Sequence, residues 1–120
     1  MKTKSERKKL IKRLDTQVSL LVRQRDGKCF TCGTTINLQC GHLFSRASYS
    51  TRWDLVNCNA QCASCNLRHE YNPHIYTNAF IDHYGLKIYK QLYKRHAEIK
   101  KWSNRELQEL LDRFIKLSTG

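Results

Sequence analysis

Acidic residues are scarce in this chain of 120 residues: 10 Asp and Glu stand against 22 Lys and Arg, so the formal net charge is +12. No apolar run of 18 residues occurs, which argues against a membrane-spanning helix. There is no apolar signal segment, and we therefore expect a cytoplasmic protein rather than a secreted one. Internal repeats and low-complexity segments are also absent, and the length predicts one domain.

The excess of basic residues is typical of a protein that binds a polyphosphate such as DNA. Nine basic residues lie between Lys2 and Arg25, against two acidic ones, Glu6 and Asp15. The alternatives are a merely soluble basic protein and, for this segment, an ordinary packing helix with a solvated face. Our candidates for phosphate contact here are Lys8, Lys9, Lys12, Arg13, Arg23 and Arg25.

Two Cys-x-x-Cys pairs are the most informative pattern in the sequence. Cys29 and Cys32 form the first pair, Cys62 and Cys65 form the second, and 29 residues separate the pairs. Pairs with this spacing place their sulfurs on tight turns that can close a tetrahedral zinc site. We expect a structural zinc ion, the alternatives being disulfides and free buried thiols. Cys40 and Cys58 belong to neither pair, and we expect them to be buried apolar thiols.

Hydrophobic periodicity predicts an α+β fold with more helix than strand. The apolar stripe Leu10, Leu14, Val18 and Leu21 marks the first helix, and it either forms a dimer interface or packs inside one subunit. The expected helices are about 4–25, ended by Gly27, then the second Cys pair to about Tyr71, 75–84, 86 to about 101, and a last helix opened by a capping box at 103–106. The expected strands are 34–40 and 54–58, on either side of a polar loop.

His42 is the candidate catalytic base. Hydrolysis of a phosphodiester needs an activated water, and a neutral imidazole suits that task near pH 7. Gly41 precedes it, and a glycine allows a DNA backbone to approach closely. The alternatives for His42 are a zinc ligand and an ordinary surface histidine.

Asn66 directly follows the second Cys pair, and its carboxamide oxygen suits magnesium. Its alternative role is a helix N-cap. His69 and Glu70 lie further along the same predicted helix and either complete a hard-metal site or are simply exposed. The remaining candidates are Arg46 and Arg52 for phosphate contact, Asn57 or Asn59 for bridging the loop between the strands, and Trp53 for the core.

Taken together, these residues resemble the NinG/Rap recombination endonucleases of lambdoid phages, within the HNH or ββα-metal nuclease superfamily. The resemblance covers roughly residues 14–85 and is looser beyond. It is carried by Leu14-Asp15-Thr16, Arg23-Gln24-Arg25-Asp26, Cys29-Phe30-Thr31-Cys32-Gly33, Cys40-Gly41-His42-Leu43-Phe44-Ser45-Arg46, Arg52-Trp53, Asn57, Gln61-Cys62-Ala63-Ser64-Cys65-Asn66, Tyr76 and Tyr84-Gly85.

The resemblance implies a bacteriophage-encoded endonuclease that acts in the host cell on branched recombination intermediates such as Holliday junctions and D-loops, with Mg²⁺ or Mn²⁺. It implies a basic helical arm (1–27), a zinc-stabilised HNH-like core (28–72) and a helical C-terminal part (73–120). The base would be His42 and a metal ligand would be Asn66. From the residues themselves we add Asn57 and Arg46 to the candidate catalytic set. Gly41 stands where a related phage resolvase has an aspartate ligand, so the second ligand falls to Glu70, His69, Asp54 or water.

Cutting a four-way junction takes two incisions, so we also expect a homodimer. Two other functions remain open: an HNH nickase or endonuclease that acts on ordinary duplex DNA, and a non-catalytic zinc-ribbon protein that binds nucleic acid.

Overall fold

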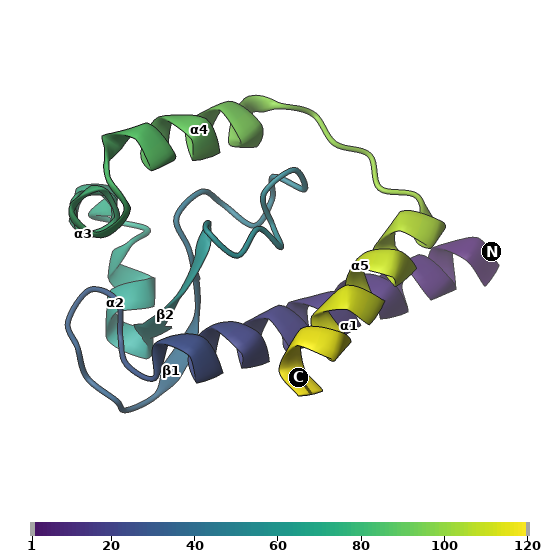
Figure 1. The fold of residues 1–120 in the computed structure, drawn as a ribbon, viewed down its shortest axis with the longest axis horizontal. Coiled ribbons are helices and arrows are strands. Elements are labelled where there is room, and N and C mark those ends of the chain that lie inside the picture. Colours follow the sequence, from purple (N-terminus) through teal and green to yellow (C-terminus); the bar gives the residue numbers. More distant parts are fainter. Residues whose placement is uncertain (1, 120) are drawn as a thin grey trace.

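A two-stranded antiparallel sheet lies between the long first helix and a pair of later helices (Figure 1). The computed structural model describes residues 2–119, and the side chains of 4–119. The fold is α+β and mostly helical, as expected. Its elements are α1 (Lys2–Asp26), β1 (Leu38–His42), β2 (Cys58–Cys62), α2 (Ala63–Arg68), α3 (Pro73–Tyr84), α4 (Leu86–Ala97) and α5 (Asn104–Thr119).

The apolar stripe of α1 packs inside the chain, against α5 and the sheet. Leu14, Val18 and Val22 are almost fully buried together with Leu107 and Leu111 of α5. Burial of one such side chain stabilises the fold by about 1.5–3 kcal/mol. Since this contact joins the two ends of the sequence (Figure 1), the stripe is a core element and not a free dimer interface.

The helix ends follow local signals. Gly27 adopts a positive φ of 66° and ends α1, as expected. The predicted capping box is confirmed, because Ser103 accepts a hydrogen bond from the Glu106 amide at 3.1 Å and its own amide donates to Glu106 at 3.0 Å. The prediction for α4 was too long: the chain becomes extended at Glu98, and Trp102 instead packs on Trp53.

Both strands lie further along the chain than predicted. Segment 34–37 is a turn rather than a strand, and Asn37 there has a φ of 54°. The Asp54 carboxylate accepts a hydrogen bond from the Val56 amide at 2.9 Å, which makes 54–57 a turn as well. Turn-forming side chains therefore outweighed the strand propensity of the residues around them.

The register of the sheet decides which side chains share a face. Cys40 pairs with Ala60 and His42 with Cys58, so these four residues face α1. The opposite face carries Gly41, and a Cβ there would collide with the side chain of Gln61. The side chain of Gln61 occupies the space that a larger residue would need, which explains why residue 41 is a glycine. The prediction that DNA approaches Gly41 closely is wrong, because Gly41 is buried.

The second Cys pair joins the sheet to α2 without a loop. Cys62 is the last residue of β2 and also the N-cap of α2, where its sulfur accepts a hydrogen bond from the Cys65 amide. The helix ends at Arg68, earlier than predicted. Asn72 is the N-cap of α3, which begins at Pro73 and not at residue 75 as expected. No helix among the described residues is long and apolar enough to cross a bilayer.

Candidate functional site

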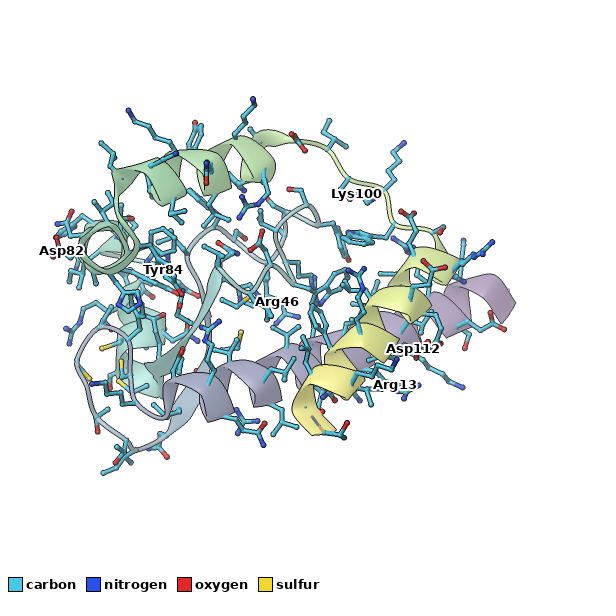
Figure 2. All side chains as sticks on the ribbon, in the orientation of Figure 1. Arg13, Arg46, Asp82, Tyr84, Lys100 and Asp112 are labelled. Carbon is cyan, nitrogen blue, oxygen red and sulfur yellow. The ribbon has the colours of Figure 1, made fainter. Side chains whose placement is uncertain are left out.

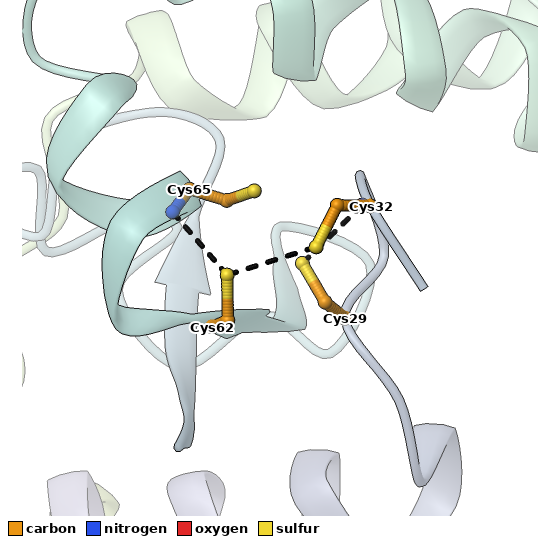
Figure 3. Close-up of side chains that lie close together, drawn as sticks. All are labelled: Cys29, Cys32, Cys62 and Cys65. Carbon is orange, nitrogen blue, oxygen red and sulfur yellow. Dashed lines mark hydrogen bonds between the residues drawn. The ribbon is translucent and has the colours of Figure 1, made fainter. Parts of the chain in front are cut away.

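Four cysteine sulfurs converge at one end of the sheet (Figure 3). Cys29, Cys32, Cys62 and Cys65, which we call the four-cysteine cluster, bring their sulfurs within 4.8 Å of one another, and no disulfide joins them. Four thiolates at this mutual distance are compatible with a tetrahedral structural zinc ion. The predicted ligand set is therefore brought together by the fold, and it does not include His42.

Backbone amides orient these sulfurs. The Cys32 amide donates to the Cys29 sulfur and the Cys65 amide to the Cys62 sulfur, each at 3.4 Å. Burial raises the pKa of Cys29, but hydrogen bonds from Thr31 and from backbone amides outweigh it and lower that pKa to about 6. A thiolate, the form that binds metal, is thus favoured at this position.

A cleft of about 560 Å³ opens beside α2 and brings most of the predicted site together. It lies between α1, the sheet, the loop 43–57 and the end of α2. The cleft is lined by Asp15, Val18, Ser19, Cys40, His42, Ser45, Arg46, Arg52, Trp53, Asn66, His69 and Glu70.

His42 is half-buried in this cleft, and its ring is held by the backbone. Its Nε2 lies 2.9 Å from the carbonyl oxygen of Arg52, an acceptor, so Nε2 carries the proton in the neutral ring and Nδ1 keeps its lone pair. Burial lowers the pKa of His42 below its ordinary value of 6.5, against the effect of this hydrogen bond, and the charge of Arg46 lowers it further. The ring is therefore neutral at pH 7.

Asp15 of α1 organises the cleft, and sequence reasoning missed this role. Its carboxylate accepts hydrogen bonds from Arg52 at 2.6 and 3.0 Å and from the Trp53 indole at 2.8 Å. Arg46, which is labelled in Figure 2, donates a hydrogen bond to the same carboxylate at 3.1 Å. Burial raises the pKa of Asp15, yet the hydrogen bonds from Arg52 and Trp53 leave it below 3.8. An acidic residue within a strongly basic stretch of helix was the available signal.

The two arginines differ in exposure and in what they can reach. The Arg52 side chain is 10% exposed and bound in two places to Asp15, whereas the Arg46 side chain is 61% exposed. Arg52 is therefore fixed within the cleft wall, and Arg46 is free to turn toward a ligand. Trp53 is 4% exposed and lies in the core, as predicted.

Asn57 is fully buried and ties the loop 43–57 together. Its amide nitrogen donates to the carbonyl oxygens of Phe44 and Thr51, each at 3.0 Å, and its oxygen accepts from the Phe44 amide at 2.8 Å. Asn59 bonds to Tyr76 and Tyr84, and it reaches this loop through one hydrogen bond to the Val56 carbonyl oxygen at 3.1 Å. Of the two asparagines considered from sequence, Asn57 thus bridges the loop that follows His42.

Asn66 lies inside α2 and is not its N-cap, since Cys62 has that position. The side-chain amide nitrogen of Asn66 donates a hydrogen bond to the Gln39 side-chain oxygen at 3.0 Å. The carboxamide oxygen of Asn66 takes no part in that hydrogen bond. We predicted that His69 and Glu70 lie near the same helical face as Asn66. In the structure both residues come after the end of α2. His69 Nε2 lies 2.8 Å from the Leu43 carbonyl oxygen, its Nδ1 is buried without a partner, and Glu70 is exposed.

The basic residues of α1 divide into two groups. Lys8, Lys12 and Arg23 fall on the same helical ridge as Asp15 and Ser19, which line the cleft. Lys9 and Arg13 are exposed on another side of α1. Arg25 makes hydrogen bonds with Asp26 and with the carbonyl oxygens of Leu55 and Cys58, and so links α1 to the turn before β2.

Cys40 and Cys58 were expected to be buried apolar thiols, and the structure agrees only for Cys58. That residue is fully buried, while Cys40 is half-buried and lines the cleft. A hydrogen bond from Cys58 lowers the pKa of Cys40. Both sulfurs lie within 4.8 Å of a ring nitrogen of His42. The i, i+2 spacing of Cys40 and His42 on one strand was the signal for this contact.

Replacing Cys29 with serine should release the metal and unfold the chain. Structural zinc contributes about 10–16 kcal/mol in small domains, which matches or exceeds a typical total stability of about 5–15 kcal/mol. Metal analysis and circular dichroism measure both effects, with Ser64→Ala in the second Cys pair as the control. A Cys29→Ser chain that folds without metal would contradict the structural role.

Replacing Asp15 with asparagine should lower the free energy of unfolding by about 1.5–3 kcal/mol, the range for hydrogen bonds to a charged group, because Arg52 loses its counter-charge. Since the folded-state pKa of Asp15 is depressed, this stabilisation is present above the unfolded pKa and is lost as the pH falls through the folded pKa. Urea unfolding at pH 7 measures it. The matched control is Asp112→Asn on the exposed side of α5, and equal stability of the two variants would refute the role.

Comparison with known proteins gives one family. The model of the family described as Bacteriophage Lambda NinG protein matches residues 1–118. Searches of curated proteins and of solved structures return no match. The match spans α1, the four-cysteine cluster, the cleft and nearly all of α5. The chain therefore belongs to the NinG family of bacteriophage lambda, as its sequence motifs predicted.

Proposed function

We propose that this protein is a structure-selective DNA endonuclease that hydrolyses phosphodiester bonds in branched recombination intermediates, such as Holliday junctions and D-loops. The observation that carries the proposal is the cleft in which a neutral histidine, two arginines and a set of hard oxygen and nitrogen ligands meet. The preference for branched DNA rests on the resemblance to NinG/Rap endonucleases.

His42 is the proposed general base. The hydrogen bond of Nε2 to the Arg52 carbonyl oxygen holds the ring and leaves Nδ1 to accept a proton from water. Asn57 acts as a positioning residue, because it holds the loop 43–57 that supplies this carbonyl oxygen. A buried, neutral imidazole with one fixed nitrogen is well suited to take a proton in a single orientation.

Arg46 is the proposed phosphate ligand of the cleft. Its exposed guanidinium can exchange its hydrogen bond with Asp15 for two hydrogen bonds to a phosphate. Arg52 keeps its salt bridge with Asp15 and adds positive potential at the cleft wall. The ridge Lys8, Lys12 and Arg23 extends this potential along α1, with Lys9 and Arg13 beside it, and offers a path for the DNA backbone. Arg25 contributes charge only, since its donors are engaged.

Asn66, Glu70 and His69 would hold a divalent cation such as Mg²⁺ or Mn²⁺. The side chains of Asn66, Glu70 and His69 line one cleft, and an amide oxygen and a carboxylate suit a hard cation. The Nδ1 of His69 is buried without a partner, so this ring would have to turn to reach the cation. Such a cation supplies charge neutralisation at the scissile phosphate. Helix α2 presents Asn66 next to the four-cysteine cluster, so the structural site sets the position of this ligand.

The order of two antiparallel strands followed at once by a helix supports an HNH-like core. In this reading His42 ends the first strand, Asn57 braces the loop, and α2 carries the metal ligands. We also propose a homodimer in the cytoplasm of the bacterial host, since two incisions resolve a four-way junction.

Replacing His42 with alanine should leave DNA binding unchanged and slow cleavage by about 10²–10⁴-fold, the usual contribution of a general base. The assay compares four-way, three-way and linear substrates of one sequence with Mg²⁺. The matched control is His74→Ala, because His74 is exposed on α3 and outside the cleft. Full activity of His42→Ala would reject the base, equal cleavage of linear duplex would favour a nickase, and a wild type that binds but never cuts would favour a zinc-ribbon protein.

The pH dependence of cleavage provides a separate test of the same residue. Because the pKa of His42 is lowered from 6.5, the half-maximal point of the acid limb of kcat/KM, measured at saturating Mg²⁺, should lie below pH 6.5. The charge of Arg46 helps to lower this pKa, so Arg46→Ala should shift the acid limb to higher pH. An acid limb above pH 6.5 in the wild type, or one that Arg46→Ala leaves in place, would contradict the assignment.

A further inference from the structure

A second group of soft metal ligands lies outside the four-cysteine cluster. Cys40, His42 and Cys58 face α1 from the same side of the sheet, and their ligand atoms all lie within 4.8 Å of one another. None of these residues belongs to the first cluster, and no disulfide joins Cys40 to Cys58. Two thiols and one imidazole are a donor set that favours zinc over magnesium.

We propose that Cys40, His42 and Cys58 form a second site for a thiophilic divalent cation such as Zn²⁺, and that this cation inhibits the protein by occupying His42. The metal site stands on the geometry of the three side chains. The inhibitory effect rests on the proposed function, because it requires His42 to be the base.

The register of the sheet favours a bound metal over a disulfide. Cys40 pairs with Ala60, so Cys58 is its diagonal neighbour, two residues away on β2. Diagonal Cα atoms in an antiparallel pair lie about 7–8 Å apart, whereas a disulfide requires less than about 7 Å. Two zinc–sulfur bonds of about 2.3 Å span a wider gap between sulfurs than one sulfur–sulfur bond of about 2 Å. An ion can therefore join these thiols without moving the strands.

The backbone already orients His42 as a metal ligand. A ligating imidazole usually donates its other N–H to a carbonyl oxygen, which fixes the ring. Here Nε2 lies 2.9 Å from the Arg52 carbonyl oxygen, which leaves Nδ1 for the cation. Cys58 directs its thiol at the same carbonyl oxygen at 3.4 Å. The orientation that makes Nδ1 a base thus also makes it a ligand, and the two roles exclude each other.

Charge and access are both suitable. Binding releases one proton from each thiol, so two thiolates and one Zn²⁺ form a neutral unit that can lie against the apolar core. The charged groups around the site are Arg46 and Arg52, both bonded to Asp15, together with Arg23, Arg25 and Asp54. Cys40 and His42 line the open cleft, through which an ion can enter and a water molecule can complete four-coordination.

Metal stoichiometry tests the site without reference to activity. The full chain, reduced and titrated with Zn²⁺, should bind two ions, and Cys40→Ser should bind one. Cys58→Ser is a second variant with the same expectation, and Ser45→Ala in the same cleft is the control that keeps two. Substitution with Co²⁺ should give thiolate-to-metal absorption that falls in Cys40→Ser but does not disappear. One ion in the wild type, or two in both cysteine variants, would overturn the proposal.

Inhibition of DNA cleavage by Zn²⁺ tests the proposed effect of this site on His42. With saturating Mg²⁺, added Zn²⁺ should inhibit wild-type cleavage, and Cys40→Ser should need at least about tenfold more Zn²⁺ for half-inhibition relative to its own uninhibited rate. Equal sensitivity of the two proteins would overturn the inhibitory role. Should the wild type bind two ions yet cut no DNA, the proposed function fails and the metal site stands. Should it cut DNA and bind one ion, only the second site fails.

Discussion

Convergence of four thiols at the junction of β2 and α2 is the constraint on which the rest of the structure depends. Cys62 ends the strand, caps the helix and joins the cluster, so the sheet and α2 have no flexible link between them. Asn66 follows Cys65 directly and inherits its position from the cluster. The four sulfurs are compatible with a structural zinc ion, and such an ion would add stability to these short strands.

Asp15 provides the second link, between α1 and the loop 43–57. One carboxylate satisfies two guanidinium groups and an indole N–H, and so fixes the wall of the cleft. The arrangement also explains how a chain with a net charge of +12 can place two arginines next to a histidine. Without the shared counter-charge, the repulsion among these cations would oppose folding.

His42 lies where these two constraints meet. The four-cysteine cluster anchors the sheet that carries it, and Asp15 anchors Arg52, whose carbonyl oxygen holds the ring. The same ring has two thiols beside it, and the second metal site proposed above would make the proposed base sensitive to thiophilic metals. A hard cation such as Mg²⁺ at the end of α2 would then support cleavage by His42, whereas a soft cation such as Zn²⁺ at the sheet would block His42.

The sequence by itself determined the two Cys pairs, the amphipathic first helix, the capping box and the family, because each depends on local spacing or on periodicity. Both strands begin later than predicted, since the turns at Asn37 and Asp54 depend on single residues and their bonds. Only the tertiary structure decided that Asp15 reaches Arg52, that Cys40 and Cys58 flank His42, and that Gly41 makes room for Gln61. These contacts join residues far apart in the chain, and no local pattern encodes which of them will meet.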